Sequence, residues 1–224
     1  IVTGVQTCAL PISFVRGAGG LEHGLWLSNE HEFELMLRGP SGAERRLTGV
    51  TGQPLEYANI AGKVPPNVVF APAGDALYFT EFERDTLVLK RIKVDGSGEV
   101  LLFRFPNAVS AVLSPDLAWI ALREYQRSFI TPSTYAGRPV TISPYESVGF
   151  AARIDREDGA YLSWSADGKT IAWTRGTGFY EKTVDQILAE SRAGLAAPPT
   201  DSASWNRPRV PGSTARRTET AIEY

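Results

Sequence analysis

Cysteine and histidine are nearly absent from this chain, and each absence narrows the chemistry it can carry. Its 224 residues include one cysteine, Cys8, and two histidines, His23 and His31. A single cysteine excludes a disulfide framework and a thiolate metal site. The separation of the two histidines matches no metal-ligand pair. We therefore interpret both histidines as solvated or hydrogen-bonded side chains.

Charge of one sign and long hydrophobic runs are also lacking. The formal net charge is −2 and the sequence pI is about 5.8, which leaves no basic footprint for nucleic acid or an anionic membrane. No apolar run approaches the ~20 residues that span a bilayer. Hydrophobic residues make up 43% and charged residues 21% of the chain, as in a globular domain with a core. We expect neither a nucleic-acid nor a membrane partner.

Residues 2–12 read V-T-G-V-Q-T-C-A-L-P-I, which is one frame of a common short-read sequencing adapter. Processing segments and sequence scars are removed before fold reasoning, so we treat residues 1–13 as an adapter-derived artefact that contains the only cysteine. The native sequence then begins near Ser13 or Phe14, and the region that would carry a signal peptide is missing.

Three ungapped copies of one pattern organise the rest of the chain. Each is an apolar strand end, a small polar turn and a second apolar strand. The repeat distance is 43 residues from Ala71 to Ser114 and 51 from Ser114 to Ser165, the range of one β-propeller blade with loop insertions. The copies are Phe70–Phe79, Leu113–Ala121 and Trp164–Trp173.

The turn residues of the repeat predict backbone geometry rather than catalysis. Asp167-Gly168 suits a tight turn, because glycine accepts positive φ and aspartate bonds the backbone ahead of it. Leu117 stands where the glycine would be, so its turn takes another geometry or carries strain. We interpret Ser114–Asp116 and Ser165–Asp167 as turn chemistry, since no histidine base stands in a recognisable motif with them.

Alternating apolar segments between the turns predict an antiparallel meander. We expect an all-β fold, a partial (open) β-propeller of about three to four blades with a C-terminal linker; a β-sandwich is the alternative. The repeat aromatics Phe70, Tyr78, Trp119, Trp164 and Trp173 are expected to lie between blades. The expected strands are Phe33–Arg38, Glu44–Thr48, Leu77–Phe82, Thr86–Val94, Glu99–Phe105, Trp119–Tyr125, Ser128–Thr131 and Arg138–Ser143.

The pattern changes after Trp173. Apolar residues of Lys182–Arg192 recur at helical spacing, although an irregular last outer strand fits the segment equally. Gly194–Pro211 is rich in proline, alanine and serine, which is typical of an interdomain connection. We assign residues 14–180 to the propeller, 181–212 to a helical or irregular linker and 213–224 to the truncated start of a following domain.

The repeat resembles the TolB-type (WD40-like) β-propeller repeat. More specifically, Arg153–Gly176 looks like the last propeller blade of secreted bacterial metal-dependent amidohydrolases. That resemblance implies an accessory, extracytoplasmic propeller fragment, inactive by itself, whose partners are its own missing blades and an amidohydrolase domain beyond Tyr224. In the missing domain, a His-x-His pair would supply the first ligands of a divalent metal (zinc), and that domain would hydrolyse C–N bonds. The tail resembles the family's connection, with Glu219–Tyr224 as the first strand of a flanking β-sandwich.

Two alternatives remain open, namely a non-enzymatic TolB-like periplasmic propeller that binds proteins, and the propeller of a serine peptidase. Within the chain we assign no catalytic, cofactor-binding or metal-binding residue. Glu81, Glu83 and Asp85 around Arg84 could bind a cation, but a charged loop explains them as well. Gly17–Gly20 lacks the helix of a phosphate cradle. The linker arginines, interpreted as solubilising, are Arg207, Arg209, Arg216 and Arg217.

Overall fold

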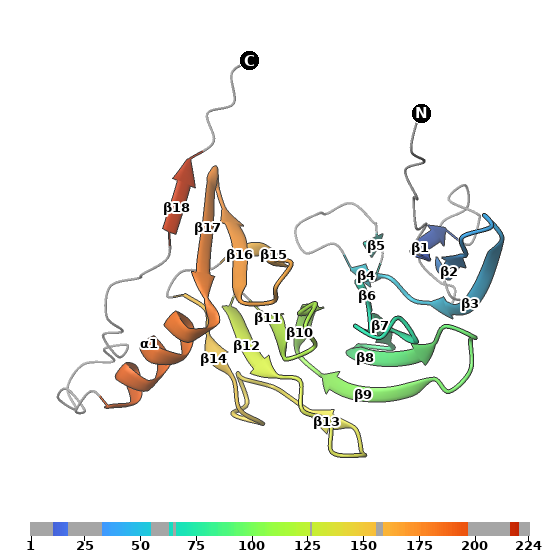
Figure 1. Cartoon of the computed structure of the whole chain (residues 1–224). Helices are drawn as coiled ribbons and strands as arrows, with labels where there is room; N and C mark the ends of the chain where they lie inside the picture. The colour runs from blue at the N-terminus through green and yellow to red at the C-terminus, as the bar shows by residue number, and fades with distance from the viewer. Residues whose placement is uncertain are drawn as a thin grey trace, which may run out of the picture. The chain divides into compact units, whose positions relative to one another are not determined.

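A computed structural model describes residues 11–17, 33–54, 63–64, 66–125, 127–155, 159–196 and 216–219. These residues form predominantly antiparallel sheets and one helix, α1 (Val184–Ala196) (Figure 1). No helix among them combines the length and the apolar character needed to cross a bilayer.

Four sheets of the described residues have the strand order of propeller blades. The first is β1-β2-β3, the second β6-β7-β8-β9 with β13 added beside β9, the third β10-β11-β12-β14 and the fourth β15-β16-β17-β18. In each, strands that follow one another in the chain lie side by side, as in a meander. The bounds are β1 Ile12–Gly17, β2 Phe33–Arg38, β3 Glu44–Val50, β6 Val68–Phe70, β7 Ala76–Glu83, β8 Thr86–Lys93, β9 Val100–Phe105, β10 Ala108–Leu113, β11 Trp119–Glu124, β12 Arg127–Pro132, β13 Val140–Thr141, β14 Ala152–Arg153, β15 Ala160–Trp164, β16 Thr170–Arg175, β17 Gly178–Thr183 and β18 Arg216–Glu219, beside a small separate pair, β4 Gln53–Pro54 and β5 Lys63–Val64.

The sheets confirm the predicted fold class, an all-β partial (open) β-propeller. Each repeat copy is the turn between the first two strands of a four-stranded sheet, and the backbone hydrogen bonds of the three copies coincide. The amide of Gly74, Leu117 or Gly168 donates to the carbonyl three residues earlier at 2.8–2.9 Å. The repeat seen in the sequence is therefore a repeat of hydrogen bonding.

Leu117 carries the backbone strain that its place in the repeat predicts. Its φ is +59°, against +71° at Gly74 and +70° at Gly168. A side chain in this left-handed region costs roughly 1–2 kcal/mol. The turn keeps its geometry and Leu117 bears that cost.

We expect Leu117→Gly to raise the free energy of unfolding by about 0.5–1 kcal/mol. Relief of the left-handed strain exceeds the larger chain entropy that glycine brings to the unfolded state. Urea unfolding measures the change. Gly168→Ala is the matched control and should destabilise, because its Cβ would lie 2.5 Å from Asp116 Oδ1. A less stable Leu117→Gly variant would contradict this account of the turn.

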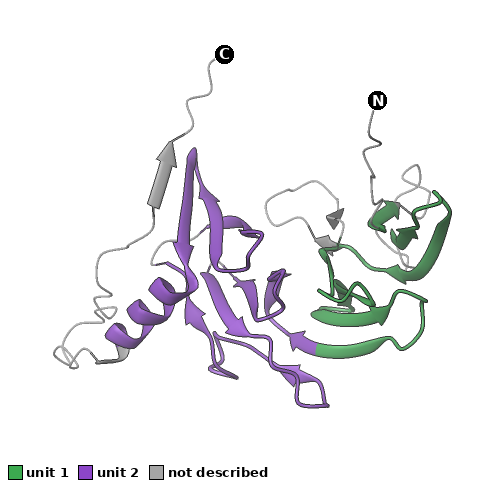
Figure 2. Ribbon diagram, in the orientation of Figure 1, with its two compact units in different colours: residues 1–102 green, residues 103–224 purple. Residues whose placement is uncertain are grey.

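The chain divides into two compact units, residues 1–102 and 103–224, with the boundary inside β9 (Figure 2). In the first unit, Leu35 and Val50 of the first sheet pack against Leu77, Phe79 and Ile92 of the second. In the second unit, the third and fourth sheets bury one cluster that includes Trp173 and Tyr180. Each unit thus holds at least one blade-on-blade core, the arrangement that stabilises repeat folds.

The repeat aromatics lie largely where we expected them. Trp173 is 1% exposed in the core of the second unit, and Trp119 and Trp164 pack against the same core. Phe70 packs against the core of the first unit. Tyr78 is half-buried.

The strand expected at Arg138–Ser143 is shorter than predicted and belongs to another sheet. The only strand there, β13, runs parallel to β9, with Val140 opposite Phe103. The outer strand of the third sheet is β14, where Ala152 pairs with Ile130 of β12. Residues 133–151 therefore form an excursion between two strands of one blade, and proline and glycine within it prevent a continuous strand.

The end of the fourth sheet also differs from the expectation. The helical alternative for Lys182–Arg192 is correct, since β17 ends at Thr183 and α1 follows. Residues 216–219, expected in a following domain, form β18 and pair with β17, Gly178 lying opposite Glu219. The boundary we drew at residue 180 thus falls inside a strand. The assignment of residues 213–224 to another domain stays a prediction.

At the other end of the chain, most of the adapter-like segment lies outside the described residues. Its last residue, Ile12, opens β1 and pairs with Arg38.

Candidate functional site

The two Ser-x-Asp turns of the second unit are built alike. The hydroxyl of Ser114 donates to Asp116 Oδ1 at 2.6 Å and accepts the amide of Trp119 at 2.9 Å. Ser165 donates to Asp167 at 2.5 Å and accepts the amide of Thr170 at 3.0 Å. Each hydroxyl is thus used within its own turn, which is a structural role, as the sequence suggested.

An ion pair joins these turns across neighbouring blades. Lys169 Nζ lies 2.7 Å from Asp116 Oδ2. Partial burial acts to raise the pKa of Asp116, but hydrogen bonds from Lys169, Ser114 and the Ala118 amide outweigh it and hold the pKa at about 2. The Asp116 carboxylate therefore fastens the fourth sheet to the third.

The low pKa of Asp116 predicts an acid-sensitive contact between blades. Because the folded-state value, about 2, lies below the ordinary 3.8, its contribution is present above about pH 4 and lost as the pH falls toward 2. Asp116→Asn should cost about 1 kcal/mol at pH 7, less than the full shift implies because water screens the ion pair, and about a third of that at pH 2.5. Urea unfolding of both proteins at the two pH values measures this difference, and an equal cost at both would contradict it.

The carboxylates singled out as a possible cation site already hold a cation of the chain. The ammonium of Lys90 contacts Glu81, lies 2.9 Å from Glu83 and lies 3.0 Å from Glu99. Burial acts to lower the pKa of Lys90, but the three carboxylates outweigh it, so the pKa stays above its ordinary value. Asp85 lies in the β7–β8 turn beside Arg84, whose φ is +57°. The charged loop is the better description.

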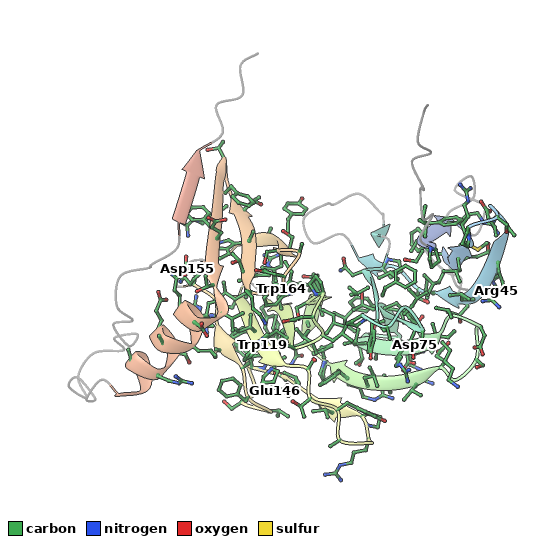
Figure 3. The ribbon with its side chains drawn as sticks, in the orientation of Figure 1. Arg45, Asp75, Trp119, Glu146, Asp155 and Trp164 are labelled. Atoms are coloured by element: carbon green, nitrogen blue, oxygen red, sulfur yellow. The ribbon has the colours of Figure 1, made fainter. Side chains whose placement is uncertain are left out.

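A buried lysine lies where β17 meets α1. The side chain of Lys182 is fully buried, and its ammonium donates to the carbonyl of Ile154 and to Glu190 Oε2, both at 2.9 Å. Asp155, labelled in Figure 3, is 3.5 Å away. An ammonium has three hydrogens to donate, so Lys182 ties together the end of the third sheet, β17 and α1.

The start of α1 is fixed by a capping box that our sequence analysis missed. The amide of Gln186 donates to Thr183 Oγ1 at 3.2 Å, and the amide of Thr183 donates to Gln186 Oε1 at 2.8 Å. Threonine followed three residues later by glutamine is the pattern of this motif, so the sequence contained the signal. The apolar face of α1, Val184 and Ile187, enters the core of the second unit, and α1 lies beside β14 and β17 (Figure 1).

Several residues considered in the sequence fall outside the described residues, namely His23, His31, Ala18–Gly20, Arg207 and Arg209. Arg216 and Arg217 lie in β18, opposite Glu181 and Tyr180. Among the described residues, no three histidine, cysteine, aspartate or glutamate side chains gather as a metal site would require.

The comparisons with known proteins assign this chain to no family. No family model and no curated protein matches the chain. Among solved structures, TolB from Acinetobacter baumannii is 15% identical, with a TM-score of 0.49 over 79% of this chain and 39% of its own. Periplasmic gluconolactonase from Pseudomonas aeruginosa is 11% identical, with a TM-score of 0.42 over 72% of this chain and 48% of its own.

A prolyl endopeptidase structure is 18% identical, with a TM-score of 0.40 over 71% of this chain and 26% of its own. This chain thus spans about half or less of the length of the proteins it is compared with. Because each of these TM-scores is below 0.5, our description of the fold rests on the sheets themselves.

Proposed function

We propose that this chain is an accessory propeller segment of a secreted, extracytoplasmic metal-dependent amidohydrolase. In this proposal a separate domain binds a divalent metal, zinc, and hydrolyses C–N bonds, while the propeller positions that domain and restricts access to it. The resemblance of Arg153–Gly176 to the last propeller blade of these amidohydrolases supports the assignment to that family. In the whole protein, further blades would be the other partners of this segment.

The observation that carries the positioning role is the attachment of α1. A propeller joined to its neighbour by a flexible linker would leave the exit of the chain free to move. Here the Lys182 ammonium is bound to Glu190 of α1 at 2.9 Å, and Ile187 is fully buried. The chain is therefore held against the fourth sheet on both sides of residues 197–215, by Lys182 at α1 and by the pairing of β18 with β17, as a positioning role requires.

The test extends the reading frame past codon 224 and compares that protein with residues 1–224. We expect a His-x-His pair in the extension, zinc retained after dialysis as measured by plasma mass spectrometry, and amide hydrolysis by the extended protein alone. Replacing each histidine of the pair with alanine is the control and should remove metal and activity together.

Other outcomes would overturn the amidohydrolase proposal in distinguishable ways. A Gly-x-Ser-x-Gly sequence and labelling by a fluorophosphonate would indicate a serine peptidase. A stop codon after one further blade, without hydrolysis, would indicate a binding propeller of the TolB kind. Lys182→Met in an active extended protein tests the positioning role separately: it should lower kcat/KM several-fold while the metal content stays unchanged, and an unchanged kcat/KM would overturn that role.

A further inference from the structure

Two exposed tyrosines form a pair at the end of the third sheet. The rings of Tyr125 and Tyr145 lie 4.8 Å apart, centroid to centroid, at an interplanar angle of 61°. Tyr125 is 54% and Tyr145 64% exposed. Tyr125 follows β11 directly, and Tyr145 belongs to the excursion of residues 133–151. The pair therefore joins two segments of the second unit and remains largely in water.

Buried polar groups hold this pair in place. The carboxylate of Glu124, 2% exposed, accepts the hydroxyl of Ser143 at 2.6 Å through one oxygen and the amide of Tyr145 at 2.9 Å through the other. The side-chain nitrogen of Asn107, Nδ2, donates to Ser143 Oγ and to Glu146 Oε1, each at 3.1 Å. Glu146, which follows Tyr145 in the chain and is labelled in Figure 3, is held in place by the hydrogen bond from Asn107.

The packing of the two tyrosine rings against each other contributes little to the stability of the fold. Rings that remain more than half exposed contribute only part of the free energy of a buried aromatic side chain. The φ of +52° at Tyr125 belongs to the two-residue hairpin turn between Glu124 and Arg127, a kind of turn that has positive φ at its first residue. The Glu124 carboxylate gives up its hydration to take part in this arrangement.

The chemistry of the pair selects a cation. The faces of tyrosine rings are electronegative and attract ammonium groups. Glu146 places an exposed carboxylate in the next residue, and Glu124 adds a second carboxylate beneath the turn. We infer that Tyr125, Tyr145 and Glu146 form a binding site for an alkylammonium group, supplied either by a small quaternary amine or by a basic peptide side chain. This inference is independent of the proposed function.

The test uses the full chain labelled with 3-fluorotyrosine and follows its fluorine resonances by NMR. Choline is the probe, and 3,3-dimethylbutan-1-ol, which has the same shape without the charge, is the matched control. We expect choline to shift the resonances of Tyr125 and Tyr145, identified by Phe substitution, and to bind about 10-fold more tightly than the alcohol. Equal binding of the two compounds, or no shift by choline at about 100 mM, would overturn the inference.

Variants distinguish choline binding by the ring faces from binding through general apolar contact. Tyr145→Leu keeps an apolar side chain and should lose choline binding, and Glu146→Gln should weaken it several-fold. Tyr135→Ala, which removes a 37% exposed tyrosine of the same excursion, should leave it unchanged. Unfolding in urea verifies that each variant folds. Full choline binding by Tyr145→Leu would overturn the site.

A lysine-containing tripeptide amide distinguishes the two sources of the cation. If it shifts the Tyr125 and Tyr145 resonances at lower concentration than choline, the site accepts a basic peptide, and the reverse order indicates a small quaternary amine. If neither compound shifts these resonances, the inference fails.

Discussion

Lys182→Met is expected to lower the free energy of unfolding by about 3–5 kcal/mol, because it leaves charges buried without their partner. Methionine fills nearly the volume of lysine, so little of the loss is a cavity. The carbonyl of Ile154 and the Glu190 carboxylate both lose a donor at 2.9 Å. Asp155 loses its nearest ammonium, although Arg175 stays 3.6 Å from it.

Equilibrium unfolding in urea measures this loss, with Lys93→Met as the matched control at an exposed position. The control should change stability by no more than about 0.5 kcal/mol. Adding Glu190→Gln to Lys182→Met should recover part of the loss, since the carboxylate that faced the Lys182 ammonium then no longer carries a charge. If Lys182→Met costs no more than the control, the buried ammonium does not hold α1.

Hydrogen exchange gives a second measurement on the same variant. The amides of α1 should lose protection before those of β16 and β17, because the helix loses its tie to the sheet while the strand ladder remains. Uniform loss of protection over the second unit would indicate global destabilisation instead.

The blades could be predicted from the sequence because their signals are local. Each copy of the repeat combines alternating apolar residues with a turn of fixed spacing, and both act over a few residues. Even the strain at Leu117 followed from comparing its position with Gly74 and Gly168. The structure confirms the all-β class and the repeated turns.

The partners of the outer strands could not be predicted, because a strand of two residues carries no periodic signal. β13 and β14 have two residues each, and neighbouring sheet edges decide where they pair. β18 pairs with β17 across the 32 residues that separate Thr183 from Arg216. Pairing over such a distance depends on which edge is open rather than on local propensity.

The charged clusters around Lys90 and Lys182 likewise could be predicted only in part from the sequence. The acidic run Glu81–Asp85 is visible in the sequence, but the lysine that neutralises it lies on the opposite strand of the hairpin. Lys182 looks like an ordinary strand residue until its pairing with Ile171 turns it toward the core. The pair of Tyr125 and Tyr145 was likewise missed, because nothing local links two tyrosines on either side of β12.

Trp173→Ala is expected to lower the free energy of unfolding by about 3–5 kcal/mol, the usual cost of emptying a large aromatic site. Trp173 is 1% exposed and stacks on Tyr180, with ring centroids 5.9 Å apart and an interplanar angle of 14°. Gly159 packs against the indole so closely that a Cβ there would lie 2.2 Å from Cδ1 of Trp173. Gly159→Ala should therefore also destabilise strongly.

Trp173→Phe distinguishes packing from hydrogen bonding at this position. The indole N–H is buried and has no hydrogen-bond partner among the described residues, and an unsatisfied buried donor costs about 1–3 kcal/mol. Phenylalanine gives up some contact area but removes this donor, so we expect a loss of less than about 1.5 kcal/mol. Urea unfolding followed by far-ultraviolet circular dichroism compares the three variants without relying on tryptophan fluorescence. If Trp173→Phe were as costly as Trp173→Ala, the indole N–H would be forming a bond that stabilises the core.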